Sequence, residues 1–129
     1  MYEPAHEDIL TLHNALNSFG EKFLEQQGAE RISQFQANLP DDEKEKIERA
    51  TARIEFNRSS GADLNERMVG LLFNFACLLP GLRREFSDAA VYEALDSSVN
   101  RTSVINLCNH VGAREVAQFF RETRGMKPA

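Results

Sequence analysis

The residues that could support catalysis or metal binding are few, and their spacing does not form a site. None of the three histidines, His6, His13 and His110, has a His or Cys at the spacing of a metal site. His6 and His13 lie seven residues apart, which places them on one side of a helix but two turns from each other. Two ligands at that separation do not meet on one ion. The sequence therefore predicts no metal site.

Nucleophilic and acid–base groups give no catalytic pattern either. The chain has no G-x-S-x-G elbow and no G-K-[ST] phosphate loop, and neither cysteine lies in the basic setting that activates a thiol. The run Asp41-Asp42-Glu43 could supply an acid and a base. Three carboxylates in a row are, however, typical of a helix start, where the helix dipole favours negative charge. We therefore predict a protein that is not an enzyme and holds no cofactor.

Basic residues gather at the C-terminal end of a chain whose net charge is −5. Residues 101–129 carry five basic and two acidic side chains, whereas residues 1–100 are strongly acidic. At low resolution, the pattern of helix, glycine and helix in this segment resembles a helix-turn-helix. Nucleic-acid binding by the hairpin of residues 101–127 is therefore an alternative function. Its contacts would be Arg101, Arg114, Arg121, Arg124 and Lys127.

Two observations weigh against that alternative. Gln118 stands where the usual helix-turn-helix pattern has an apolar residue, about six positions after the turn glycine. The acidic remainder of the chain also opposes a polyanion unless it lies on the far face. We therefore favour a packed helix pair with solvated arginines.

Hydrophobic periodicity predicts an all-α fold. Apolar residues recur at spacings of three and four, and no alternation of period two is long enough for a strand. We expect one domain over residues 1–129, a compact bundle of about five to seven helices. The predicted helices cover about residues 5–26, 32–39, 42–56, 64–79, 101–111 and 113–123, with a further short helix after Ser87.

The predicted central helix covers residues 64–79. Its segment MVGLLFNFACLL is interrupted only by Gly70 and Asn74, so every side of this helix is apolar, as in helices that are buried all round. The run is shorter than the roughly 20 residues of a membrane span, so we expect no membrane insertion. Asp63 with Glu66 predicts a capping box at its start. Pro80-Gly81 predicts its end.

The sequence also predicts the environment of several individual side chains, on the central helix and elsewhere, and the location of the protein. We expect Asn74 to bond to a backbone carbonyl of its own chain, because a buried amide needs partners. Cys77 and Cys108 are predicted to be reduced, buried thiols. The first residues lack the basic and apolar stretches of a secretory leader, so we expect a cytoplasmic protein. The side chains expected to be nearly free of solvent are Leu72, Phe75, Cys77 and Leu79, with Ile9, Leu16, Phe19 and Phe23 packed around them.

An excess of apolar surface favours an interaction protein. The first helix carries an apolar stripe, and a 129-residue chain has limited capacity to cover both this stripe and an all-apolar helix. We therefore expect an adaptor, an inhibitor or a small subunit that binds a protein partner or forms a homodimer. The predicted contact residues are Leu12, Phe19 and Phe23, or alternatively the outer face of Met68–Leu79.

Overall fold

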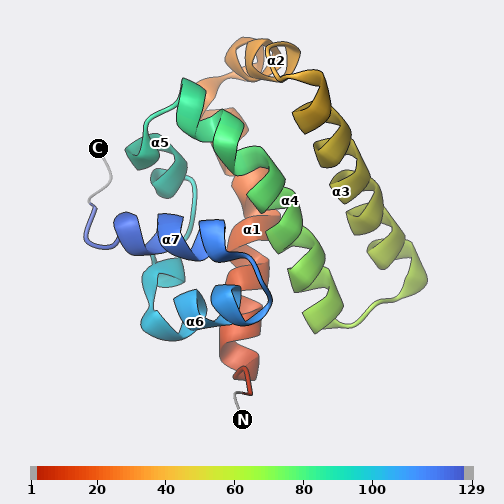
Figure 1. Ribbon diagram of the computed structural model, residues 1–129, viewed down its shortest axis with the longest axis vertical. Helices are drawn as coiled ribbons and strands as arrows, with labels where there is room; N and C mark the ends of the chain where they lie inside the picture. Colours follow the sequence, from red (N-terminus) through yellow and green to blue (C-terminus); the bar gives the residue numbers. More distant parts are fainter. Residues whose placement is uncertain (1–2, 127–129) are drawn as a thin grey trace.

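Helices α1 (His6–Gln27) and α4 (Leu64–Glu85) lie side by side in the middle of the molecule, with the other helices around them (Figure 1). The computed structural model describes residues 3–126, and within that range it contains seven α-helices, one short 3-10 helix and no strand. The prediction of an all-α bundle is confirmed. The remaining elements are α2 (Ala29–Ala37), α3 (Asp41–Ser60), α5 (Asp88–Glu93), η1 (Ser97–Asn100), α6 (Thr102–His110) and α7 (Arg114–Glu122).

Helix α4 is the element that its neighbours share. It packs most extensively against α3 on one side and against α1 on another. The chain runs up α1, crosses through α2, returns down α3 and runs up again in α4 (Figure 1). Helices α1 and α4 therefore point the same way and α3 points the opposite way. The α6–α7 hairpin packs on α1 and α4 away from α3.

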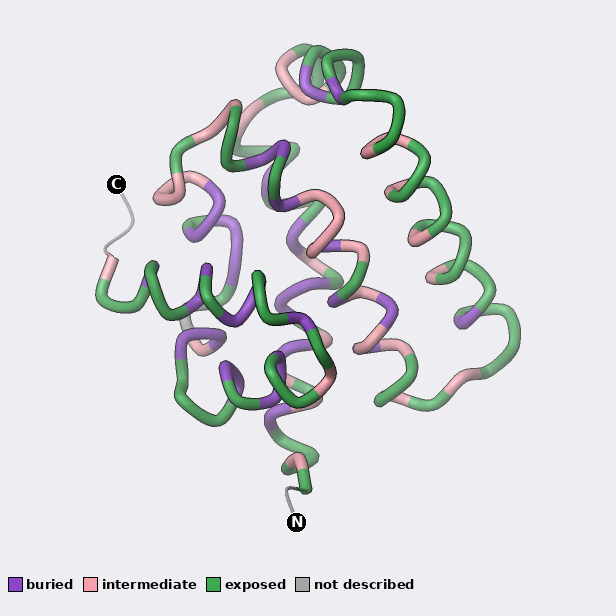
Figure 2. Tube along the Cα trace, in the orientation of Figure 1, coloured by how far each residue is buried: buried purple, intermediate pink, exposed green. Residues whose placement is uncertain are grey.

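The core is aromatic and lies where α1, α4 and α7 meet. Phe75 of α4 is 2% exposed, and its ring centroid lies 5.2 Å from that of Phe19 in α1. The centroids of Phe119 and Phe120 in α7 each lie 6.3 Å from that of Phe75. The buried residues follow this junction, whereas the outer side of α3 is exposed along its length (Figure 2). Phe75 therefore joins three helices in one cluster.

The predicted end of the central helix at Pro80 is wrong. A proline inside a helix removes one backbone hydrogen bond and crowds the preceding turn. Helix α4 nevertheless continues to Glu85, because its last turns pack against α2 and the residues that follow α2. Leu82 is buried, and a Cβ atom at Gly81 would lie 2.9 Å from Leu39 Cδ2. Packing between helices outweighs the local signal.

Helix α3 also extends beyond its predicted end, through Ser60. Asn57, the first residue after the helix predicted over 42–56, is buried, and its Nδ2 donates a hydrogen bond to the carbonyl oxygen of Glu66 in α4 (3.3 Å). The helix ends at Gly61, whose φ of 72° suits a residue without a side chain.

The predicted cap of α4 is confirmed, since Asp63 Oδ1 accepts from the backbone N–H of Glu66 (2.8 Å).

Helix α4 is not buried on every side, although its composition predicts that it is. Phe73 is 37% exposed and Cys77 is half-buried, so the prediction for Cys77 is wrong. The reason is that the neighbouring helices leave one side of α4 uncovered. The predicted core residues that are buried on α4 are Leu72, Phe75 and Leu79.

Asn74 has a different partner from the one predicted. It is half-buried, and its Nδ2 donates to Thr51 Oγ1 of α3 at 3.3 Å, not to a backbone carbonyl. The amide therefore links α4 to α3. Both cysteines are free thiols, as predicted, and Cys108 is buried.

Replacing Phe75 tests the aromatic junction. Phe75→Ala should lower the free energy of unfolding by about 3–5 kcal/mol, because it leaves a cavity among three helices. The matched control is Phe56→Ala on the outer side of α3, where the side chain is 67% exposed and the change should stay within about 0.5 kcal/mol. Chemical denaturation measures both. Equal effects for the two variants would contradict this core.

Candidate functional site

The predicted contact residues on α1 lie inside the chain. Leu12, Phe19 and Phe23 are all buried, because α4 and the C-terminal hairpin cover the stripe that they form. They are therefore core residues of this chain. An exposed contact surface has to come from other side chains.

Most of the arginines predicted to contact nucleic acid are bound to other groups of the chain. Arg101 pairs with Asp8 (3.2 Å) and with Glu7 (3.6 Å), so carboxylates lie beside its charge although its side chain is 43% exposed. Arg124 donates through Nε to the carbonyl oxygen of Asn100 (3.1 Å). Arg121 donates to Gln118 (2.8 Å), Arg114 is exposed at the start of α7, and Lys127 lies outside the described residues.

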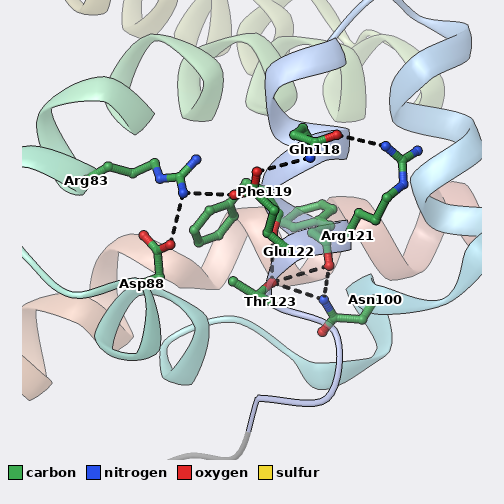
Figure 3. A network of polar contacts seen from close by, with 9 residues as sticks. Arg83, Asp88, Asn100, Gln118, Phe119, Arg121, Glu122 and Thr123 are labelled. Carbon is green, nitrogen blue, oxygen red and sulfur yellow. Dashed lines mark hydrogen bonds and ion pairs between the residues drawn. The ribbon is translucent and has the colours of Figure 1, made fainter.

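A polar network at the C-terminal end of the fold fastens α7 to its neighbours (Figure 3). Arg83 of α4 donates to Asp88 of α5 (3.0 Å) and to Glu122 of α7 (2.9 Å). Hydrogen bonds from Gln118 and Arg83 lower the pKa of the Glu122 carboxyl below its usual value. Because these groups satisfy one another, the network has a structural role.

The same end of α7 is held by η1. Asn100 Nδ2 donates to the carbonyl oxygen of Phe120 (2.6 Å) and to Thr123 Oγ1 (3.2 Å), and both Asn100 and Thr123 are buried (Figure 3). Thr123 Oγ1 in turn donates to the carbonyl oxygen of Phe119 (2.9 Å). These bonds take up carbonyls at the end of α7 that would lack partners within the helix.

A hollow lies between α1, α3 and α4, and all three helices contribute side chains to its lining. We call it the basic hollow. Its volume is about 320 Å³, and its charged lining residues are Arg58 and Arg67, beside His13. Arg58 Nη2 donates to Asn17 Oδ1 across the hollow (3.3 Å), which links α3 to α1. The full lining is His13, Asn17, Ile54, Asn57, Arg58, Arg67 and Leu71, with no acidic side chain.

A second hollow lies between the same three helices at the end near α2. We call it the apolar hollow. Its volume is also about 320 Å³, and side chains of α2 close one end of it. Leu24, which lines it, remains 44% exposed. The other lining residues are Phe19, Gly20, Phe23, Ile32, Phe35, Gln36, Leu39, Ile47, Leu78 and Leu82.

The two hollows lie in line on one face of all three helices. On each helix, one or two lining residues of the first hollow have a counterpart in the second hollow seven positions, or two turns, away. This shift corresponds to about 10 Å along each helix at 1.5 Å per residue. We interpret the two hollows as parts of one groove, with walls from α1 and α3 and a floor from α4. The pairs are His13 with Gly20 and Asn17 with Leu24 on α1, Ile54 with Ile47 on α3, and Leu71 with Leu78 on α4.

Gly20 lines the apolar hollow at a position where close packing does not require a glycine. Three glycines lie inside helices, and two of them permit close packing: a Cβ at Gly70 would lie 3.0 Å from Asn57 Nδ2, and Gly81 has a still closer neighbour. A Cβ at Gly20 would meet nothing within 4 Å. Glycine inside a helix destabilises it by about 0.5–1 kcal/mol relative to alanine. No close packing contact within residues 3–126 requires a glycine at this position.

The groove was not predicted from the sequence, because its lining comes from three helices whose relative positions the hydrophobic pattern does not specify. Gly20 is the signal that could have pointed to it, since it interrupts a helix with no turn or cap nearby. No group of three or more His, Cys, Asp or Glu side chains within residues 3–126 is placed to hold a metal ion. None of the helices in this range has the length and apolar character needed to cross a bilayer.

Searches against protein-family models, curated proteins and solved structures found no match to this chain. The groove is therefore interpreted from its own geometry.

The Glu122 network predicts a pH-dependent contribution to stability. A carboxyl whose pKa is lowered in the folded state stabilises the fold above its unfolded pKa, and this stabilisation is lost as the pH falls. Glu122→Gln should therefore be less stable than the wild type near pH 7, and the difference should vanish in acid. Denaturation at several pH values measures this. A difference that is constant with pH would contradict it.

The two cysteines should differ in reactivity. Burial raises the pKa of the Cys108 thiol to about 12, so the nucleophilic thiolate is almost absent at pH 8. Cys77 is half-buried on the uncovered side of α4. An aromatic disulfide reagent should label Cys77 in the native protein and reach Cys108 only after denaturation. Fast native labelling of a Cys77→Ala variant would contradict this.

Proposed function

We propose that this protein is a non-enzymatic interaction module that binds an amphipathic helix of a protein partner in the groove between α1 and α3. The observation that carries the proposal is Gly20, whose missing side chain leaves open space in the groove wall at a cost to helix stability. A glycine at such a position allows another backbone to approach closely. Binding an amphipathic helix in an apolar groove is a recurrent mode of peptide recognition.

The spacing of the hollows supports a helix as the occupant. A helix lying along the groove places side chains that are seven residues apart on one face, about 10 Å from each other. The lining residues that correspond between the two hollows are also seven positions apart. The groove runs along α4 from Arg67 to Leu82, so a helix of about 15 residues would fill it. A single small molecule would fill one hollow and leave the other empty.

The apolar hollow supplies the surface for such a partner. Leu24 is substantially exposed there, and Ile32, Ile47 and Leu78 are only half-buried. Covering apolar area of this kind is the main source of affinity in protein association. The nucleic-acid alternative has less support, because Arg101 is paired with carboxylates and Arg121 and Arg124 have partners inside the chain.

A displayed library of helical peptides of about 15 residues tests the proposal. We expect selection on the wild-type protein to enrich peptides with apolar residues at spacings of three, four and seven. Gly20→Trp should weaken the binding of these peptides by at least about tenfold, because the new side chain enters the apolar hollow. The matched control is Glu21→Trp, an equally large change at an exposed neighbour outside both hollows.

Stability measurements separate binding from folding. Gly20→Ala should raise the free energy of unfolding by about 0.5–1 kcal/mol, since the site is helical and a methyl group meets no neighbour. Peptides that bind Gly20→Trp as well as the wild type would contradict the groove. A wild-type dimer in sedimentation equilibrium that Gly20→Trp converts to a monomer would show that the occupant is a second copy, and would overturn the proposal of a separate partner.

A further inference from the structure

We infer that the basic hollow is a carboxylate site that receives an aspartate or glutamate of the bound helix. This acidic residue lies seven residues along the bound helix from the apolar side chain that fills the apolar hollow. The inference rests on the proposed function, because it specifies the chemistry of the same occupant. It is carried by the two arginines in the hollow and by the shielded Nε of Arg67, which has no partner among the described residues.

Arg67 is the main observation. Its Nε–H is shielded from solvent and donates to no partner among the described residues. No ion pair of Arg67 with a carboxylate occurs within residues 3–126. A shielded donor on a cationic group is costly when it stays unpaired, and such groups in folded proteins usually have a partner. A carboxylate that enters the hollow would supply that partner.

Arg58 lines the same hollow and also has no carboxylate partner in the described range. Its one recorded hydrogen bond goes to the neutral amide oxygen of Asn17, at 3.3 Å. A guanidinium has five N–H donors, so most of them remain available. Two arginines that share a hollow without an acidic residue create a positive potential, and an anion there would reduce their mutual repulsion.

Ion pairs with carboxylates are formed within residues 3–126 by Arg49, Arg83, Arg84 and Arg101, whereas none is formed there by Arg31, Arg53, Arg114, Arg121 and Arg124. What distinguishes Arg67 is its shielded Nε without a partner. The chain has 20 acidic and 15 basic Lys and Arg residues, so carboxylates are in excess. The two arginines of the basic hollow lack carboxylate partners although such groups are abundant.

A carboxylate on a helix fits better than a free anion for a geometric reason. The basic hollow is in line with the apolar hollow, at the spacing of residues seven apart on one helix face. Guanidinium groups bind carboxylates through paired, directional hydrogen bonds. The apolar hollow would then contribute most of the affinity, and the carboxylate would fix the register and direction of the helix in the groove.

Synthetic peptides of about 15 residues taken from the groove-binding selection provide the probe. Three versions carry glutamate, glutamine or lysine at the position that is seven residues from the main apolar side chain. We expect the glutamate version to bind the wild type about tenfold more tightly than the glutamine version, with an advantage that falls as salt is added. The lysine version should bind most weakly.

Charge reversal in the protein tests the partner residues. Arg58→Glu and Arg67→Glu should each abolish the preference for glutamate, and Arg58→Glu should improve binding of the lysine version. Arg53→Glu is the matched control, because Arg53 is an exposed arginine on α3 outside both hollows. Arg58 is exposed, so its variant remains informative if Arg67→Glu lowers stability.

The outcomes separate this inference from the proposed function. If Gly20→Trp blocks the peptides but all three versions bind equally, the groove binds a helix and the carboxylate site is overturned. If Gly20→Trp has no effect, the proposed function itself fails. Millimolar phosphate or acetate that stabilises the wild type, but not Arg58→Glu, and leaves the glutamate preference unchanged would assign the hollow to a free anion and would also overturn the inference.

Discussion

The packing of α4 against both α1 and α3 is the constraint on which the rest of the structure depends. Phe75 faces α1 and the C-terminal hairpin, whereas Asn74 and Gly70 face α3. Because α1 and α3 both pack on α4, they flank it, and the hydrogen bond from Arg58 to Asn17 links them at one end. The groove follows directly from this arrangement, since two helices that rest on a third leave a channel over its surface.

Much of the fold could be predicted because the buried residues obey a helical period. Leu72, Phe75 and Leu79 recur at spacings of three and four and are buried together. Residues that locally indicate the end of a helix were less informative. Pro80 and Asn57 were predicted to end helices, but contacts that each segment makes with a distant part of the chain hold both residues in helices. Such contacts cannot be seen in a single stretch of sequence.

The candidate site was less predictable than the fold, for a physical reason. Apolar periodicity identifies the side of a helix that is buried, and it selected Leu12, Phe19 and Phe23 because they are core residues. A binding surface consists of residues that the core does not use, such as Leu24 and Gly20. The unpaired state of Arg67 depends on which carboxylates the fold brings near it, and this becomes visible only in three dimensions.

The attachment of α3 has a consequence for how the groove would accept a ligand. This helix packs chiefly on one neighbour, its outer side is exposed, and it ends at Gly61, a residue with freedom of backbone rotation (Figure 2). Segments with few buried contacts open at a lower free energy than the rest of a fold. Although α3 packs extensively on α4, Asn57 is its one buried residue, so we expect the wall formed by α3 to yield more readily than the wall formed by α1. The width of the channel would then adapt to side chains of different size.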